Sequence, residues 1–150
     1  QFNIGFVTMP LATEQLQLDR IACTDAVCLV PKKHPLAQKD MIDVTDLAGQ
    51  HVIFANQPNI AADETLKLIE ERHIALAGKT EANIGSICAM VENNVGLSVM
   101  NPITAGDLAS SGTVLKPFTP KIQYSFGMIY AKKWRDNQMI KLIHQILKST

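Results

Sequence analysis

The clearest pattern of apolar and polar positions runs over residues 80–102. Asn83 can cap a helix here, because its side-chain oxygen can accept a backbone N–H from the first turn. The apolar side chains that follow repeat at positions i, i+3, i+4 and i+7, which predicts one buried helix face. They are Ile84, Ile87, Cys88 and Val91. Asn93 and Asn94 are expected to end this helix, since asparagine tolerates the left-handed conformation.

An apolar run interrupted by Gly96 and Ser98 follows over residues 95–100, which predicts a strand buried on both faces. Asn101 and Pro102 then offer a second helix start, with proline at the first helical position. In α/β folds, helix N-termini that follow strands gather at the sheet edge where ligands bind. We therefore expect this stretch to supply half of a binding cleft.

The same reading predicts the other elements. Strands are expected over residues 1–7, 16–20, 26–30, 51–55, 114–118 and 124–130, and helices over residues 44–47, 60–72 and 102–109. The helix over residues 60–72 should start at the cap Asn59 and bury Ala62, Leu66 and Ile69. Gly78 reads as a break in the pattern. A last helix, capped by Asp136, should turn five apolar side chains inward: Met139, Ile140, Ile143, Ile146 and Leu147. This alternation of strands and helices predicts a mainly parallel α/β sheet.

The strand over residues 1–7 starts without a preceding cap or loop. We expect upstream sequence to precede a strand of this kind in a natural domain. The strand should then present an open sheet edge or exposed apolar surface, which a second chain could cover.

The composition and the net charge narrow the classes of function open to this chain. The 150 residues fit one domain, and 47% of them are hydrophobic, enough for a substantial core. Lys and Arg number 14, as do Asp and Glu, so the formal net charge is +0. This balance argues against a chain that binds nucleic acid by itself, which normally needs a basic face. A small anionic ligand needs only local positive potential and remains possible.

The three cysteines, Cys23, Cys28 and Cys88, show no zinc-ligand spacing with histidine. We interpret them as reduced thiols of a cytoplasmic protein, with Cys88 on a core helix face. No signal peptide and no apolar run of about 18 residues is present, so we expect no membrane partner. We also expect no metal and no cofactor.

Catalytic motifs are absent from the sequence: it has no G-x-S-x-G elbow, phosphate-binding glycine loop or G-x-G-x-x-G motif. The four histidines do not form a metal-binding pair with a carboxylate between them. His34, beside prolines and lysines, is interpreted as a structural or solvated loop residue. We therefore predict that the chain is not an enzyme, with one alternative, an α/β enzyme that uses Cys88 as a catalytic thiol.

Small polar residues recur at strand ends and helix starts: Thr8, Asn56, Asn83, Ser86 and Asn101. The simpler interpretation is that each caps its own helix or turn. The other interpretation is that the group binds a ligand, because backbone N–H groups at helix N-termini hold a carboxylate or phosphate without a charged side chain. Gly85 would let such a ligand approach the backbone closely. This pattern favours a small anionic or zwitterionic ligand.

Three motifs carry a family resemblance: DAVCLVPKKHPLA at residues 25–37, DLAGQHVIFA at 46–55 and SICAMVENNVGLSVMNPITA at 86–105. In this order they resemble the effector-binding domain of LysR-type transcriptional regulators. The third motif is similar to the branch that contains the regulators of lysine biosynthesis and opine catabolism. Effectors in that branch are amino acids or amino-acid conjugates.

The resemblance implies a periplasmic-binding-protein type II-like α/β fold with two Rossmann-like lobes and a hinge. Residues 1–23 and 124–150 would belong to an incomplete lobe one, and residues 24–123 to lobe two. The winged helix-turn-helix that binds DNA would be absent from this chain. The implied function is to sense a small amino-acid-like effector between the lobes and to relay its binding to that DNA-binding domain. Regulators of this family also associate as homo-oligomers, dimers or tetramers, through their effector domains.

Carried over by position, the resemblance implies a set of effector-binding residues, to which we add Asn56 from the polar group above. The implied residues are Thr8, Met9 and Pro10 after the first strand, Ala82, Asn83, Ile84, Gly85 and Ser86 around the helix start, and Asn101 and Pro102. Ala82 and Ile84 stand where relatives often carry polar residues. The alternative function is a solute-binding protein of the same fold that delivers a small ligand to a transporter.

Overall fold

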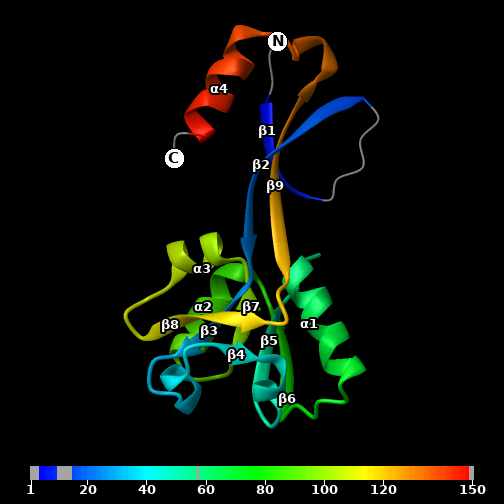
Figure 1. Ribbon diagram of the computed structural model, residues 1–150. Helices are drawn as coiled ribbons and strands as arrows, with labels where there is room; N and C mark the ends of the chain where they lie inside the picture. Colours follow the sequence, from blue (N-terminus) through cyan, green and yellow to red (C-terminus); the bar gives the residue numbers. More distant parts are fainter. Residues whose placement is uncertain (1–3, 10–14, 57, 149–150) are drawn as a thin grey trace. The chain divides into compact units, whose positions relative to one another are not determined.

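The chain folds into two compact units (Figure 1). Unit 1 combines Gln1–Thr24 with Tyr124–Thr150, and unit 2 is the continuous segment Asp25–Gln123. The structure, a computed structural model, describes residues 4–9, 15–56 and 58–148.

Unit 1 is a small antiparallel sheet with one long helix (Figure 1). Its elements are β1 (Ile4–Met9), β2 (Leu16–Asp25), β9 (Gln123–Ala131), the short 3-10 helix η3 (Lys132–Trp134) and α4 (Gln138–Lys148). β9 lies between β1 and β2, and β1 runs antiparallel to β9 with Ile4 opposite Tyr130. The core is formed by Met128, Tyr130 and Ile140. The sheet is therefore assembled from both ends of the chain.

The edge expected at the first strand is present. In the part of the chain that the structure describes, β9 is the one strand paired with β1. The side chain of Phe6 on β1 is 62% exposed. Strand β1 therefore presents both an open edge and an apolar surface.

Two predictions for the last helix are wrong. Asn137, not Asp136, caps α4, because its side-chain oxygen accepts the backbone N–H of Met139 at 2.8 Å. Met139 and Ile146 are more than half exposed and do not face inward. The helix carries two neighbouring apolar stripes, and only the stripe that contains Ile140 packs against the sheet.

Asp19 on β2 joins α4 to the sheet through a polar network. It accepts a short hydrogen bond from the Tyr130 hydroxyl, and its Oδ2 lies 3.0 Å from Nε2 of His144. Gln17 donates to its other oxygen at 2.9 Å. Burial acts to raise the pKa of Asp19, but these hydrogen bonds outweigh it and lower the pKa below its usual value. Burial, together with the hydrogen bond to Asp19, raises the pKa of Tyr130 to about 12.

Unit 2 is an α/β unit with a mixed sheet. Its elements are β3 (Val27–Pro31), η1 (Pro35–Gln38), β4 (Ile42–Asp43), η2 (Val44–Leu47), β5 (His51–Ala55), α1 (Ile60–Glu71), β6 (Gly78–Ala82), α2 (Ile84–Glu92), β7 (Ser98–Met100), α3 (Pro102–Leu108) and β8 (Thr113–Thr119). Four strands lie in the order β4-β8-β3-β7, and β5 pairs with β6. A parallel bridge between Val52 and Leu97 connects the two groups.

The sheet of unit 2 departs from the prediction in three ways. It is mixed and not mainly parallel, because β3 runs antiparallel to both β7 and β8. Strand β6 was missed, since it begins at Gly78, which the pattern reads as a break. Strand β7 is shorter than residues 95–100, and Val95 at its expected start is 42% exposed. The strands that do run parallel are β4 with β8 and β5 with β6.

The predicted helix α2 is confirmed. Ile87, Cys88 and Val91 are buried against Leu29 and Ile53 of the neighbouring strands. The helix ends at Glu92, and Asn94 takes the left-handed conformation with φ 61°. In α1, by contrast, the buried face is Ala61, Ala62, Thr65 and Ile69, and the expected Leu66 is only half-buried.

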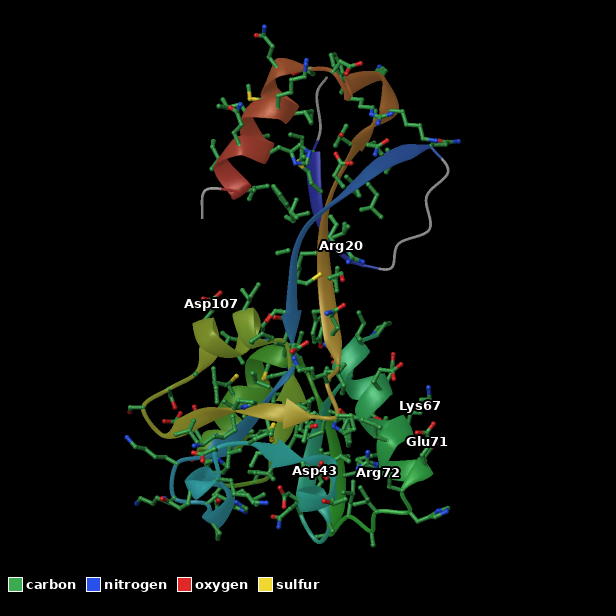
Figure 2. All side chains as sticks on the ribbon, viewed as in Figure 1. Arg20, Asp43, Lys67, Glu71, Arg72 and Asp107 are labelled. Carbon is green, nitrogen blue, oxygen red and sulfur yellow. The ribbon has the colours of Figure 1, made fainter. Side chains whose placement is uncertain are left out.

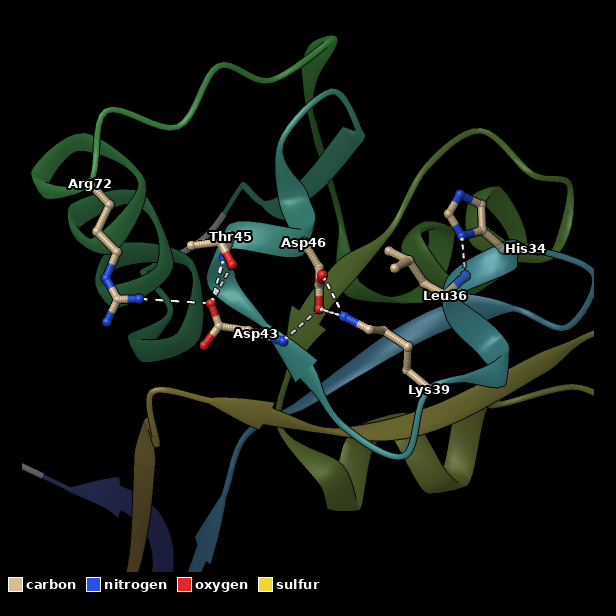
Figure 3. Close-up of polar contacts among 7 residues, drawn as sticks. All are labelled: His34, Leu36, Lys39, Asp43, Thr45, Asp46 and Arg72. Atoms are coloured by element: carbon tan, nitrogen blue, oxygen red, sulfur yellow. Dashed lines mark hydrogen bonds and ion pairs between the residues drawn. The ribbon is translucent and has the colours of Figure 1, made fainter.

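The HPLA and DLAG motifs form a structural cluster (Figure 3). A ring nitrogen of His34 accepts a backbone N–H of the turn that it caps. Asp43 and Asp46 form a capping box around η2, and Lys39 pairs with Asp46 at 2.6 Å. The Arg72 guanidinium at the end of α1 lies 3.7 Å from Asp43. These contacts explain both motifs by local structure, without a ligand.

Two glycines make room for His51 on β5. A Cβ at Gly78 would lie 2.5 Å from Nδ1 of the His51 ring, and a Cβ at Gly96 would lie 2.4 Å from the His51 carbonyl oxygen. The ring also bonds Thr80 Oγ1 through Nε2, at 2.7 Å. A side chain at either position would therefore force His51 to move: its ring at position 78 and its backbone at position 96.

Candidate functional site

Asn83, Asn56 and Asn101 lie at neighbouring strand ends along one edge of the unit 2 sheet. β5 and β6 run parallel with Ala55 opposite Ala82, and the backbone N–H of Asn56 donates to the Ala82 carbonyl at 3.0 Å. On the other side of β5, the bridge pairs Val52 with Leu97.

Counting forward in these two registers places Asn56 level with Asn83 on one side and with Asn101 on the other. We call Asn83, Asn56 and Asn101 the asparagine row. Each member follows the carboxyl end of one of three adjacent strands, the edge where α/β sheets bind ligands.

Helices begin along this row. Asn83 and Asn101 each accept a backbone N–H from the first turn of the following helix at 2.9 Å, so both predicted caps are confirmed. Asn59 caps α1 in the same way, with two such bonds of 3.0 and 3.3 Å. Asn59 was recognised as a cap in the sequence but not as a neighbour of the site. Its position in a loop after a predicted parallel strand was the available signal.

The capping geometry makes this edge rich in hydrogen-bond donors. Capping engages the side-chain oxygens of Asn83 and Asn101, so their NH₂ groups are left to donate outward. The N-termini of α1 and α2 add backbone N–H groups and the positive end of the helix dipole. No charged residue occurs over residues 82–86 or 101–103. Such an edge suits a carboxylate or another anionic group.

Gly85 differs from the two glycines beside His51. A Cβ built at this position meets only the side-chain oxygen of Asn83, at an ordinary contact distance of 3.5 Å. Gly85 is exposed in the first turn of α2. Packing within the chain therefore does not require glycine here, although glycine weakens a helix by about 1 kcal/mol relative to alanine.

The other predicted site residues are distributed between the two units. Ala82 ends β6, while Ile84 and Ser86 lie in the first turn of α2, beside the row; Pro102 starts α3. Thr8 is an exposed residue of β1 in unit 1, where it pairs with Phe126. Met9 ends the same strand, and its side chain and Pro10 lie outside the described residues. The predicted residues of unit 2 thus lie along the asparagine row or next to it, and Thr8 and Met9 belong to unit 1.

The chemistry of the cysteines disfavours the thiol-enzyme alternative. Cys88 is 6% exposed, and burial raises its pKa, which disfavours the reactive thiolate. Burial likewise raises the pKa of Cys28, to about 12. Among the described residues, no group of three histidines, cysteines or carboxylates could hold a metal ion, and none of the helices there could cross a membrane.

Comparison with known proteins relates the chain to one family. Over residues 1–150 it matches the family model of the LysR substrate binding domain. It is 32% identical over 121 residues to the transcriptional activator protein LysR of Escherichia coli, a match that covers 80% of the chain and 38% of that protein. It is 24% identical over 105 residues to the regulatory protein NocR of Agrobacterium tumefaciens, covering 69% and 35%. The matched part is thus well under half of either relative.

Among solved structures, the chain resembles the Synechocystis CcmR regulatory domain in complex with 2-PG. The TM-score is 0.75 at 14% identity, and the match covers 97% of the chain and 72% of that domain. This likeness confirms the predicted fold class, periplasmic-binding-protein type II-like α/β. Both relatives are named as regulators.

Proposed function

Since the family model covers its whole length, the chain belongs to the LysR substrate-binding domain family, and we propose that it senses a small amino-acid-like effector. This membership confirms the resemblance predicted from the three motifs. In the proposed function, effector binding is relayed to a DNA-binding domain outside this chain, in a cytoplasmic regulator that works as a homo-oligomer. The names of the two relatives, an activator and a regulatory protein, support this proposal.

The asparagine row carries the proposal. Its donors and helix N-termini suit the carboxylate that amino acids share. Large apolar ligands would gain little at an edge formed mainly by amide groups and backbone N–H groups. The effector would act by binding one arrangement of the domain more tightly than another, since only such a difference in affinity shifts a conformational equilibrium.

The experiment compares Gly85→Ala with Gly106→Ala. Both glycines lie in helices, and a Cβ at Gly106 meets nothing within 4 Å, so both variants should fold at least as stably as the parent chain. The parent chain is first screened by thermal unfolding against lysine, arginine, ornithine, other amino acids and dicarboxylates. A ligand that binds only the folded chain adds about 2.7 kcal/mol at a hundredfold excess over its dissociation constant.

We expect an amino acid to raise the melting temperature of the parent chain and of Gly106→Ala. The rise should be lost in Gly85→Ala, where the added methyl group blocks approach to the α2 N-terminus. If no amino acid stabilises the parent chain, the proposed effector class is wrong. If Gly85→Ala responds as well as Gly106→Ala, the effector binds elsewhere.

A further inference from the structure

An ion pair lies at the end of the asparagine row. In the β3–β7 pairing, Val27 is opposite Met100, so Ala26 lies level with Asn101 and Asp25 is the next residue. The backbone N–H of Ala26 donates to the Ile122 carbonyl at 2.8 Å, which places Lys121 beside Asp25. Lys121 Nζ lies 2.7 Å from Asp25 Oδ2.

The pair is exposed enough to exchange its partner. The side chain of Lys121 is 79% exposed and that of Asp25 is 37% exposed. Ion pairs this open to water contribute little to folding stability. The ammonium group of Lys121 contacts the Asp25 carboxylate, and the ammonium group of a ligand could replace it there. Asp63, in the first turn of α1, already has a structural explanation, because a carboxylate there complements the helix dipole.

We propose that Asp25 binds an ammonium group of the effector, which displaces Lys121 from the carboxylate. This inference rests on the proposed function, because it completes the site whose other end holds the effector carboxylate. Asp25 would thereby be a specificity-determining residue: the row selects the acid, and Asp25 selects the charge at the opposite end of the ligand. Asparagine at this position would keep the shape but lose the charge.

Strand spacing indicates which ammonium group is bound. Adjacent strands lie about 4.8 Å apart, so β3, which begins two residues after Asp25, lies about 5 Å from Asn101, about 10 Å from Asn56 and about 14 Å from Asn83. An α-ammonium lies only about 3 Å from its own carboxylate, whereas the distal ammonium of an extended dibasic amino acid lies about 7–8 Å away. The Asp25 side chain and its hydrogen bond span the remaining distance. For a carboxylate bound at Asn56 or at the α2 N-terminus beside Asn83, only a distal ammonium comes within reach of Asp25, whereas a carboxylate bound at Asn101 would bring the α-ammonium there.

The test uses calorimetric titration of the 150-residue chain with L-lysine and with L-norleucine, which has the same carbon chain without the distal ammonium. We expect the parent chain to bind lysine more tightly than norleucine, by up to about fivefold, the range for an ion pair that is open to water. Asp25→Asn should abolish this preference. Asp107→Asn, which makes the same charge change near the end of α3, should retain it (Figure 2). Lys121→Gln removes the competing ammonium and should tighten lysine binding by up to about fivefold.

Each outcome decides the proposal. Equal affinity of the parent chain for lysine and norleucine, or binding of dicarboxylates alone, would overturn the role of Asp25 and leave effector sensing intact. If no compound binds, both the role of Asp25 and the proposed effector class fall. Circular dichroism checks that Asp25→Asn is folded. If Asp25→Asn is not folded, the Lys121→Gln variant tests the proposal instead. Unchanged or weaker lysine binding in that variant would refute the displacement of Lys121 by the ligand.

Discussion

Substituting the two glycines beside His51 should destabilise the fold to different extents. A Cβ at Gly78 would clash with the His51 side chain, whereas a Cβ at Gly96 would clash with the His51 backbone. Alanine at position 96 would bring its Cβ to 2.4 Å from the His51 carbonyl oxygen, where real contacts are at least 3.0 Å. That carbonyl also accepts the backbone N–H of Leu97 at 2.9 Å, so it cannot move alone. We expect Gly96→Ala to lower the free energy of unfolding by about 3 kcal/mol, the upper part of the range for overpacking.

Alanine at position 78 meets the His51 ring instead, at 2.5 Å from Nδ1. The ring can swing away, at the cost of its 2.7 Å hydrogen bond to Thr80. We expect Gly78→Ala to lower the free energy of unfolding by about 1–2 kcal/mol.

The decisive measurement repeats both glycine substitutions in a His51→Ala background. Removing the ring should relieve Gly78→Ala by about 1 kcal/mol and should leave the cost of Gly96→Ala unchanged, because the carbonyl remains. Urea unfolding followed by circular dichroism gives all the free energies, and similar m-values show that the transitions are comparable. If His51→Ala rescued Gly96→Ala as fully as Gly78→Ala, the argument from the carbonyl contact would be refuted.

Three further predictions concern single side chains. Thr65→Val should raise the free energy of unfolding by about 1 kcal/mol, because the fully buried Thr65 hydroxyl has no hydrogen-bond partner among the described residues. Urea unfolding measures this change, and a lower free energy of unfolding would contradict the assignment. Asp19→Asn should make the free energy of unfolding less sensitive to acid. Its folded pKa is lowered by Tyr130 and His144, so its contribution is complete above the usual value of 3.8 and is lost as pH falls below it; parallel pH–stability curves for variant and parent would refute this. A thiol reagent should label the exposed Cys23 rapidly and the two buried cysteines slowly, as peptide mass mapping would show; rapid labelling of all three would contradict their burial.

The sequence predicts best where local rules decide the structure. Asn83, Asn101 and Asn59 were identified as caps because capping depends only on the next few residues. The face of α2 followed from helical spacing, since Ile87, Cys88 and Val91 are buried and the predicted Ile84 is partly buried on the same face. The resemblance of the motifs provided the fold class, which periodicity alone did not determine.

The sequence predicts the structure less well where contacts between residues far apart in the chain determine it. Strand β6 begins with glycine and carries two charged side chains, so its composition resembles a loop, and its pairing with β5 makes it a strand. The antiparallel pairing of β3 with β7 and β8 joins segments far apart in the chain, so the local residue pattern does not predict it. On α4, Met139 and Ile140 are equally apolar, and only packing distinguishes the exposed one from the buried one. The charged pair at Asp25 was missed because it joins residues far apart in the chain.

The strand order of unit 1 has a consequence for synthesis on the ribosome. Among the described residues, β1 and β2 each pair with β9, which is the last strand of this sequence to be made. The roughly hundred residues of unit 2 are translated in between, which takes roughly 5–20 s at 5–20 residues per second. Unit 2 is continuous and can fold as it emerges, while β1 and β2 still lack their pairing with β9. During that interval the nascent chain is a candidate client for chaperones that shield strand edges.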